Sequence, residues 1–158
     1  MSSFCESQPP PAMSAHRLDT LARHVIGSQP FTQSLSPYPA AAGGQRPPVT
    51  SHVLDTGSGK PAQGVSVTLE MMEAGAFQKI GGDFTNSDGR CPKLLAIDHK
   101  LLPGVYRCTF DTKAYYAAKG EQCFYPEVPI IFEIKAINEH YHIPLLVSNF
   151  GFSTYRGS

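Results

Sequence analysis

The sequence lacks an excess of charge of either sign, because its 13 Lys and Arg residues are balanced by 13 Asp and Glu residues. No run of five or six like charges occurs in it. A protein that grips a phosphate backbone irrespective of sequence needs a basic face. The composition therefore argues against nucleic acid as a partner.

Long apolar runs and closely spaced cysteines are also missing. No stretch reaches the roughly 18 to 20 apolar residues of a membrane span, and the N-terminus has no apolar segment typical of a secretory signal. We therefore expect a soluble, intracellular protein without a membrane partner. The cysteines are Cys5, Cys91, Cys108 and Cys123, and none forms a CxxC pair. This spacing predicts free thiols rather than disulfides or a structural zinc site.

Proline and polar residues are concentrated near the N-terminus, where eight of the 14 prolines fall within the first 48 residues. Such a segment cannot bury enough apolar surface to offset the entropy of ordering. We therefore predict a flexible Pro/Ser/Ala-rich tail over residues 1–46 and a single domain over 47–158. Within the tail, Ala15–Ile26 has apolar residues at helical spacing, although an isolated helix of this length is marginal in water.

Short segments of alternating polarity dominate the rest of the chain. They predict strands at Val49–Thr56, Val65–Glu70, Phe77–Phe84, Gly104–Asp111, Val128–Ile137, His140–Asn149 and Phe150–Tyr155. One helix is expected over Asp111–Gly120, because Asp111 or Thr112 can cap its start and Gly120 can end it. The pattern predicts an all-β, antiparallel sandwich with one short helix, including a hairpin with a tight turn at Asn138-Glu139.

Two isolated polar residues could carry chemistry. His52 lies in the first predicted strand and shares a face with Thr50 and Leu54, since side chains alternate with a period of two. A lone strand histidine is most often only half-exposed. Arg90 directly follows the Asp88-Gly89 turn, where an arginine is usually solvated. Alternatively, a rigid turn could aim its N–H donors at a planar, oxygen-rich ligand.

A further polar group occurs at His140-Tyr141-His142. Strand alternation places both histidines on one face, and Tyr141, Ile143, Leu145 and Val147 towards the core. The two imidazoles could bind a metal, but a catalytic zinc usually has three protein ligands and spacing supplies no third one. Pro144 lacks an N–H and cannot donate to a ladder there, which suggests an open edge or a distortion. In the terminal run, Ser153 and Tyr155 would share a face and could offer hydroxyls to a ligand.

Several blocks together resemble the transthyretin-like family, and within it the 5-hydroxyisourate hydrolases. The resemblance is strongest in TSHVLDTGSGKPAQGVSV (Thr50–Val67), FTNSDGRCPKLL (Phe84–Leu95) and HYHIPLLVSNFGFSTYRGS (His140–Ser158). Pro103–Thr112 and Cys123–Ile134 match in outline. The final YRGS together with the HYHIPLL strand is highly specific to the enzymes, and the resemblance runs from Val49 to the C-terminus.

The resemblance implies a transthyretin-like sandwich of two four-stranded sheets, assembled as a homotetramer with active sites in a channel between dimers. It implies hydrolysis of 5-hydroxyisourate to 2-oxo-4-hydroxy-4-carboxy-5-ureidoimidazoline in urate degradation, without metal or cofactor. The positions matching the family's catalytic residues are His52, Arg90 and His142. His52 and Arg90, with Ser153 and Tyr155, match substrate-binding positions. A neutral histidine would activate water, and Arg90 would stabilise developing negative charge.

Some features depart from the family pattern or leave alternatives open. Asn149 stands where proline is usual and Phe152 where tyrosine is common, which affects packing more than catalysis. A channel protein that binds a small aromatic ligand, a metal-dependent hydrolase and an inactive scaffold are the competing interpretations. In the tail, Arg17-Leu18 and His24-Val25, five residues apart, resemble an N-terminal peroxisomal targeting signal over residues 17–25. This predicts an import receptor as partner and a peroxisomal location, with the cytoplasm as the alternative.

Overall fold

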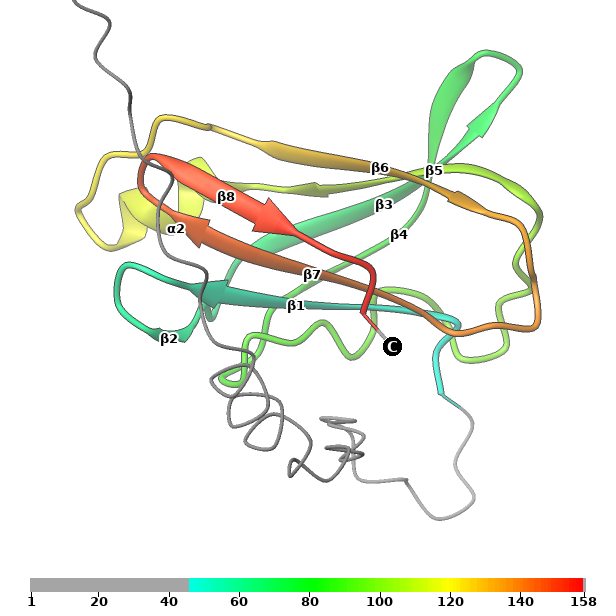
Figure 1. Cartoon of the computed structure of the whole chain (residues 1–158), viewed down its shortest axis with the longest axis horizontal. Coiled ribbons are helices and arrows are strands. Elements are labelled where there is room, and N and C mark those ends of the chain that lie inside the picture. Colours follow the sequence, from blue (N-terminus) through cyan, green and yellow to red (C-terminus); the bar gives the residue numbers. More distant parts are fainter. Residues whose placement is uncertain (1–45, 158) are drawn as a thin grey trace, which may run out of the picture. The chain divides into compact units, whose positions relative to one another are not determined.

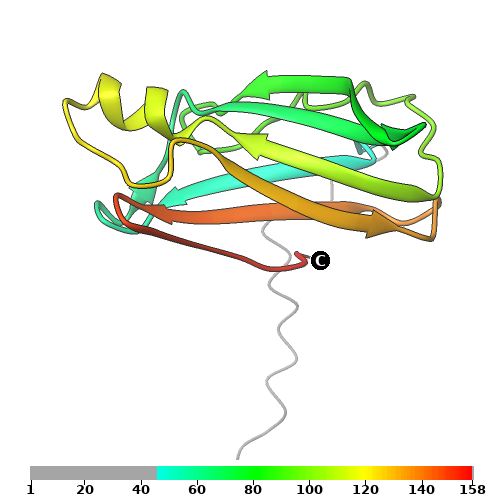
Figure 2. The same ribbon diagram turned by 90° about the horizontal axis from the view of Figure 1, so that it is seen from above.

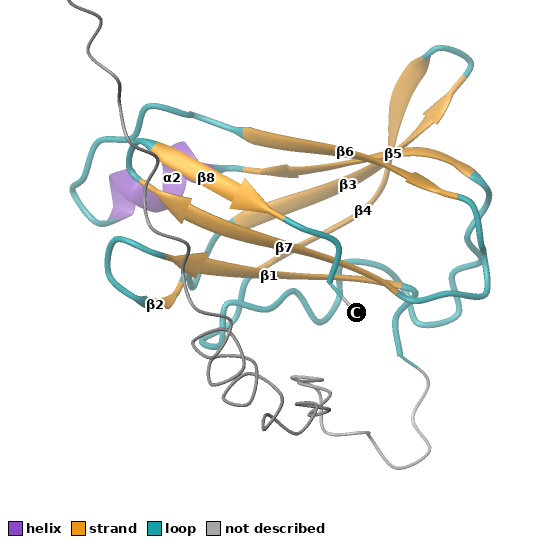
Figure 3. Ribbon diagram, in the orientation of Figure 1, coloured by secondary structure: helices purple, strands orange, loops and turns teal. Residues whose placement is uncertain are grey.

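The computed structural model describes residues 46–157. The predicted tail, with its targeting segment at 17–25, lies outside the described residues apart from Arg46. The described elements are β1 (Val49–Asp55), β2 (Lys60–Pro61), β3 (Ser66–Glu73), β4 (Ala76–Phe84), β5 (Gly104–Phe110), α2 (Thr112–Ala118), β6 (Val128–Ile134), β7 (Tyr141–Ser148) and β8 (Gly151–Thr154). Strands therefore dominate, with one short helix in this part of the chain (Figure 3).

The strands form two four-stranded sheets, in the orders β2-β1-β7-β8 and β4-β3-β5-β6. Seen from above, the sheets are two packed layers, with α2 at one end (Figure 2). The predicted sandwich of two four-stranded sheets is thus confirmed. One detail differs, because β1 and β7 pair in parallel. Alternation of polarity does not encode strand direction, and the long excursion through the second sheet supplies the connection that a parallel pair needs.

The predicted hairpin at Asn138-Glu139 is wrong. β6 pairs with β5 in one sheet, whereas β7 lies between β1 and β8 in the other. The segment between β6 and β7 therefore crosses from one layer to the other (Figure 1). Its turn is held by the Tyr141 hydroxyl, which donates to the Ala136 carbonyl at 3.1 Å. Both strands have the alternation of a half-buried strand, and that pattern does not say which sheet each one joins.

The core lies between the layers and is filled by alternate residues of each strand. On β7 the predicted inward-facing set is confirmed, with Tyr141, Ile143, Leu145 and Val147 all buried. Cys91 and Cys108 are buried free thiols, and Cys123 is a partly exposed one. Burial, with a smaller effect of Asp83, raises the pKa of the Cys91 thiol to about 12, so it is neutral and unreactive near pH 7.

Helix α2 begins where the Asp111 carboxylate accepts a hydrogen bond from the Ala114 amide at 2.9 Å, as the capping pattern predicted. Gly120, with φ of 71°, follows its end, and its amide donates to the Ala117 carbonyl. No helix among residues 46–157 is long and apolar enough to cross a membrane.

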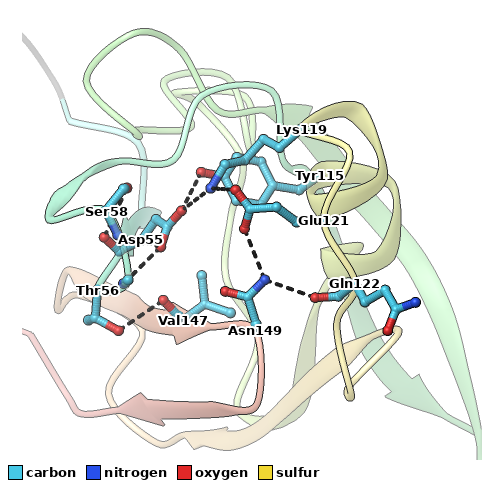
Figure 4. A network of polar contacts seen from close by, with 10 residues as sticks. Asp55, Thr56, Ser58, Tyr115, Lys119, Glu121, Gln122, Val147 and Asn149 are labelled. Atoms are coloured by element: carbon cyan, nitrogen blue, oxygen red, sulfur yellow. Dashed lines mark hydrogen bonds and ion pairs between the residues drawn. The ribbon is translucent and has the colours of Figure 1, made fainter.

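A polar cluster joins α2 to the end of β1 (Figure 4). The buried Asp55 carboxylate accepts from Lys119 Nζ at 2.7 Å and from the Tyr115 hydroxyl at 3.0 Å. Burial opposes ionisation of Asp55, but these hydrogen bonds, with that from the Ser58 amide, lower its pKa. Lys119 also pairs with Glu121 at 3.0 Å. The Asp55 carboxylate thus has several hydrogen-bond donors, and those from Tyr115 and Lys119 anchor the helix to β1.

Candidate active site on the outer face of the β1–β7 pair

The polar residues singled out in the sequence meet on the outer face of the sheet that contains β1 and β7. In the parallel register Thr50 lies opposite His142, and His52 lies opposite Pro144. Because directly paired residues point to the same side of a sheet, Thr50, His52 and His142 share this face. His142 is 6% exposed, whereas His52 is half-buried. The central position of these two strands gives the histidines a rigid base.

Arg90 is placed beside His52 by the turn that precedes it. Asn86 Oδ1 accepts from the amides of Asp88 and Arg90, both at 3.0 Å, which closes the turn. Arg90 then forms an antiparallel bridge with His52. Gly89 has φ of 72°, and a Cβ there would lie 2.3 Å from the Val53 carbonyl oxygen. Only glycine permits this close approach of the turn to β1.

Electrostatics keep the two histidines neutral. Burial is the largest cause that lowers the pKa of His142, to about 4, and the positive charge of Arg90 is the next. His140 and His52 lower it further, while the Thr50 backbone opposes the shift. Burial and Arg90 likewise lower the pKa of His52, against smaller opposing effects of Asp88. Near pH 7 the site therefore presents neutral imidazoles beside a fixed guanidinium.

Two histidines share one hydroxyl in this site. Thr50 Oγ1 lies 2.8 Å from His142 Nδ1 and 3.0 Å from His140 Nε2. The other ring nitrogen of His140, Nδ1, lies 3.0 Å from the Pro47 carbonyl oxygen. His140 thus has both ring nitrogens engaged in hydrogen bonds. Among the described residues, no group of three or more His, Cys, Asp or Glu side chains is arranged to hold a metal ion.

The C-terminal segment returns to this site after β8. The Gly157 amide donates to the His142 carbonyl at 3.0 Å, and a Cβ on Gly157 would lie 2.4 Å from His142 Cδ2. Gly157 therefore packs directly against the imidazole. The β7–β8 ladder ends at the pair Leu145–Thr154, next to Pro144. β7 lies between β1 and β8 here, and the Thr154 hydroxyl donates to the Pro144 carbonyl at 2.8 Å.

The two candidate hydroxyl residues of the terminal run lie within β8 and just beyond its end. Ser153 pairs with Leu146 and so lies on the face of His142. Tyr155 lies beyond the end of β8 and lines a hollow of about 260 Å³ with Ile143, an inward-facing residue of β7, and Phe132 of β6. The predicted final strand extends to Tyr155, whereas β8 ends at Thr154.

Three contributors were not assigned a catalytic or binding role from the sequence. Strand alternation places Thr50 on the face of His52 but does not link it to His142, because the link depends on the parallel register. The sequence suggests a role for His140 only as a metal ligand. Gly157 gave no signal beyond its place in the YRGS ending. A local sequence pattern does not predict that two strands about 90 residues apart pair in parallel, and these contacts depend on that pairing.

The fold and the site together define a small β-sandwich protein with neutral imidazoles and a guanidinium on one sheet face, a combination suited to acid–base chemistry. The sequence model of the HIUase/Transthyretin family matches residues 49–157, and the chain belongs to this family.

Relatives and solved structures agree with this assignment. A 5-hydroxyisourate hydrolase of Mus musculus is 44% identical over 113 residues, which cover 70% of this chain and 95% of the relative. The structure of the Klebsiella pneumoniae 5-hydroxyisourate hydrolase has a TM-score of 0.62 at 34% identity, with 70% of this chain and 97% of that one covered. A transthyretin from Sparus aurata has a TM-score of 0.67 at 30% identity and covers 71% of this chain and 97% of its own.

Proposed function

We propose that this protein is an enzyme that hydrolyses 5-hydroxyisourate to 2-oxo-4-hydroxy-4-carboxy-5-ureidoimidazoline in urate degradation. The single observation that carries the proposal is the meeting of His52, Arg90 and His142 on one sheet face. Arg90 bridges His52, and the charge of Arg90 and the nearness of His52 both act on the pKa of His142. Relatives that carry the name of this activity support the choice of substrate.

The chemistry requires a base, an electrostatic stabiliser and an acid. A neutral His142 would take a proton from water as the water oxygen bonds to a ring carbonyl carbon. The carbonyl electron pair then moves onto oxygen, where Arg90 stabilises the negative charge. As the carbon–oxygen double bond re-forms, the ring C–N bond breaks and the nitrogen takes a proton from the imidazolium. His52 would orient the water or deliver this proton. The steps need no metal or cofactor.

Negative charge that develops on the substrate oxygen would also change the pKa of His142. Burial and the charge of Arg90 hold His142 at a pKa of about 4 in the structure, which makes it neutral but weakly basic. An oxyanion beside Arg90 would offset the guanidinium charge and raise the pKa of His142 as the proton arrives. The imidazole would therefore become a stronger base at the step that uses it.

We propose a homotetramer as the working form, with Ser153 and Tyr155 as substrate-binding residues. β6 and β8 are the outer strands of their sheets on the same side of the sandwich. They expose apolar side chains there, including Ile131 and Phe152, and pairing between copies would cover such edges. Ser153 would bind substrate from the sheet face that carries His142. Tyr155 would reach the active site of a neighbouring copy in the tetramer. A molar mass by light scattering of four chains is expected, and a fully active monomer would contradict the proposal.

The substrate assignment is tested by generating 5-hydroxyisourate from urate in situ and following its ultraviolet decay with and without the purified protein. We expect the protein to accelerate the decay strongly, and equally after treatment with a chelator. Loss of activity on chelation, restored by a metal, would favour the metal-dependent alternative. Tight binding of an aromatic ligand without acceleration would favour a carrier.

We also propose a peroxisomal location, supported by the spacing of Arg17-Leu18 and His24-Val25 in the sequence. Recognition by an import receptor would require these residues to be displayed together. A fluorescent reporter carrying residues 1–46 should collect in punctate organelles that contain a peroxisomal marker. Diffuse fluorescence would indicate the cytoplasm instead.

A further inference from the structure

Three hydrogen-bond contacts run in series from the backbone to His142. The Pro47 carbonyl oxygen lies 3.0 Å from His140 Nδ1, and His140 Nε2 lies 3.0 Å from Thr50 Oγ1. Thr50 Oγ1 lies 2.8 Å from His142 Nδ1. Thr50 is 4% exposed and His142 6%, so water competes little for the last contact. The series starts at a group with a fixed hydrogen-bonding role and ends on the proposed base.

The direction of each hydrogen bond follows from that fixed end. A carbonyl oxygen can only accept, so His140 Nδ1 must carry a proton. A neutral imidazole has one N–H, so His140 Nε2 is then an acceptor and the Thr50 hydroxyl donates to it. With its proton used, the Thr50 oxygen accepts at the remaining contact, and His142 Nδ1–H must donate. The unprotonated nitrogen of His142 is therefore Nε2.

The opposite arrangement requires a second proton on His140. If the Thr50 hydroxyl donated to His142 Nδ1, His140 would have to donate from both ring nitrogens and be an imidazolium. Burial is the larger cause that lowers the pKa of His140, and the charge of Arg46 adds to it, while the Pro47 carbonyl opposes both. The neutral form of His140, and hence the first arrangement, is favoured near pH 7.

We propose that Thr50 and His140 are positioning residues that hold His142 in the tautomer whose Nε2 accepts the proton from water. This inference rests on the proposed function, since it assigns roles around the proposed base. After His142 takes the proton, its Nδ1–H continues to donate to Thr50 without any rearrangement. Gly157 packs against the ring and limits its rotation. The hydroxyl and the glycine thus fix a tautomer and an orientation before substrate binds.

The direct test is the tautomer of His142 in the full-length protein. Long-range ¹H–¹⁵N correlation spectra of histidine-labelled protein at pH 7 distinguish protonated from unprotonated ring nitrogens. We expect protonated Nδ1 and unprotonated Nε2 on both His142 and His140. Finding the proton of His142 on Nε2 would overturn the proposal, and this measurement needs neither substrate nor a variant.

Substitutions at Thr50 test the kinetic consequence. Thr50→Val removes the hydroxyl at nearly constant volume, and we expect it to populate both tautomers of His142 and to lower kcat by about tenfold to a hundredfold. The KM should change by no more than about twofold, because substrate contacts are untouched. Thr50→Ser keeps the hydroxyl and should retain both the tautomer and most of kcat. A folded Thr50→Val protein with unchanged kcat would overturn the proposal.

The two proposals fail in different ways. If the unmodified protein does not accelerate the decay of 5-hydroxyisourate, the substrate assignment fails, while the spectrum still decides the tautomer. If the unmodified protein is active but His142 carries its proton on Nε2, the positioning role fails and the activity stands.

Discussion

Two polar clusters lie along strand β1. The one at its Asp55 end favours ionised side chains, and the other favours neutral ones. At one end, the buried Asp55 carboxylate is paired with Lys119 and accepts from the Tyr115 hydroxyl. Hydrogen bonding and charge there lower the pKa of Asp55 and raise that of Lys119, so both stay ionised. At the other end, burial and the charge of Arg90 act together to keep His142 and His52 from becoming charged.

This difference separates a structural role from a functional one. Charges in the Asp55 cluster satisfy each other, which stabilises the folded chain and leaves little capacity for chemistry. The imidazoles are held neutral beside a cation, which costs folding free energy at low pH but keeps a proton acceptor available. Perturbed pKa values occur in both clusters. The charge state that the shift favours, ionised for Asp55 and neutral for the histidines, identifies the candidate active site.

The largest expected effect follows from removing the proposed base. His142→Ala should lower kcat for 5-hydroxyisourate by about a hundredfold or more, because general-base assistance contributes about 10² to 10⁴ in rate. The ultraviolet decay of in situ generated substrate measures it. His99→Ala is the matched control, since His99 lies in the loop between β4 and β5 and should leave kcat unchanged. Equal losses in both variants would show that the effect is not specific to His142.

Breaking the other cluster should reduce stability. Asp55→Asn removes the carboxylate that Lys119 and Tyr115 donate to, and leaves donors facing a donor. We expect a loss of about 3 kcal/mol in the free energy of unfolding, near the lower end for a broken buried pair, because the Lys119 side chain is 31% exposed. Urea unfolding at fixed protein concentration measures it.

The exposed pair Lys135–Glu133 provides a control for this stability effect, with side chains 80% and 57% exposed. Glu133→Gln should change the free energy of unfolding by less than about 1 kcal/mol. If Asp55→Asn were no more destabilising than Glu133→Gln, the Asp55 cluster would not be an anchor of α2.

The fold was largely accessible from the sequence because alternation and capping are local signals. Asp111 and Gly120 bound the helix, and Tyr141 to Val147 show which side of β7 faces the core. Direction and partner of a strand are not local. The parallel pairing of β1 with β7 and the assignment of β6 to the second sheet depend on contacts between distant segments.

The candidate site was accessible in part for the same reason. His52, Arg90 and His142 stood out by residue type and by resemblance to a family, and the structure places them together. The hydroxyl that links His140 to His142 could not be found, since Thr50 lies about 90 residues away in the chain. The predicted last strand ends one residue beyond β8, at Tyr155, because a strand end cannot be located to one residue from polarity alone.

As pH falls, the neutral histidines should reduce the free energy of unfolding before protonation of the carboxylates does. The folded state holds His142 at a pKa of about 4, below its ordinary 6.5, so the unfolded chain binds the proton first as pH falls. Stability is therefore complete above about pH 6.5 and declines down to about pH 4. A pKa shift of this size corresponds to a loss of about 3 kcal/mol in the free energy of unfolding, at about 1.4 kcal/mol per pKa unit.

Urea unfolding from pH 7.5 to 4 measures this decline, and His142→Ala should reduce its slope in that window. The Asp55 contribution has the same sign but falls at lower pH, because the folded pKa of Asp55 lies below its ordinary 3.8. Asp55→Asn should therefore leave the slope between pH 6.5 and 4.5 unchanged. A slope that depended on Asp55 there, and not on His142, would contradict the contrast between the two ends of β1.

The smallest expected effect concerns the separate contributions of burial and of the Arg90 charge to the lowered pKa values of the histidines. Burial is the larger cause of the lowered pKa values of His142 and His52, and the Arg90 charge is the second. Arg90→Gln should therefore raise both pKa values but leave them below 6.5, as followed by NMR titration. Arg156→Gln is the matched control, since Arg156 pairs with Glu139 at 2.6 Å and is not among the causes of either shift. Full return to 6.5 in Arg90→Gln would mean that the guanidinium alone, rather than the packing of the sheet face, keeps the proposed base neutral.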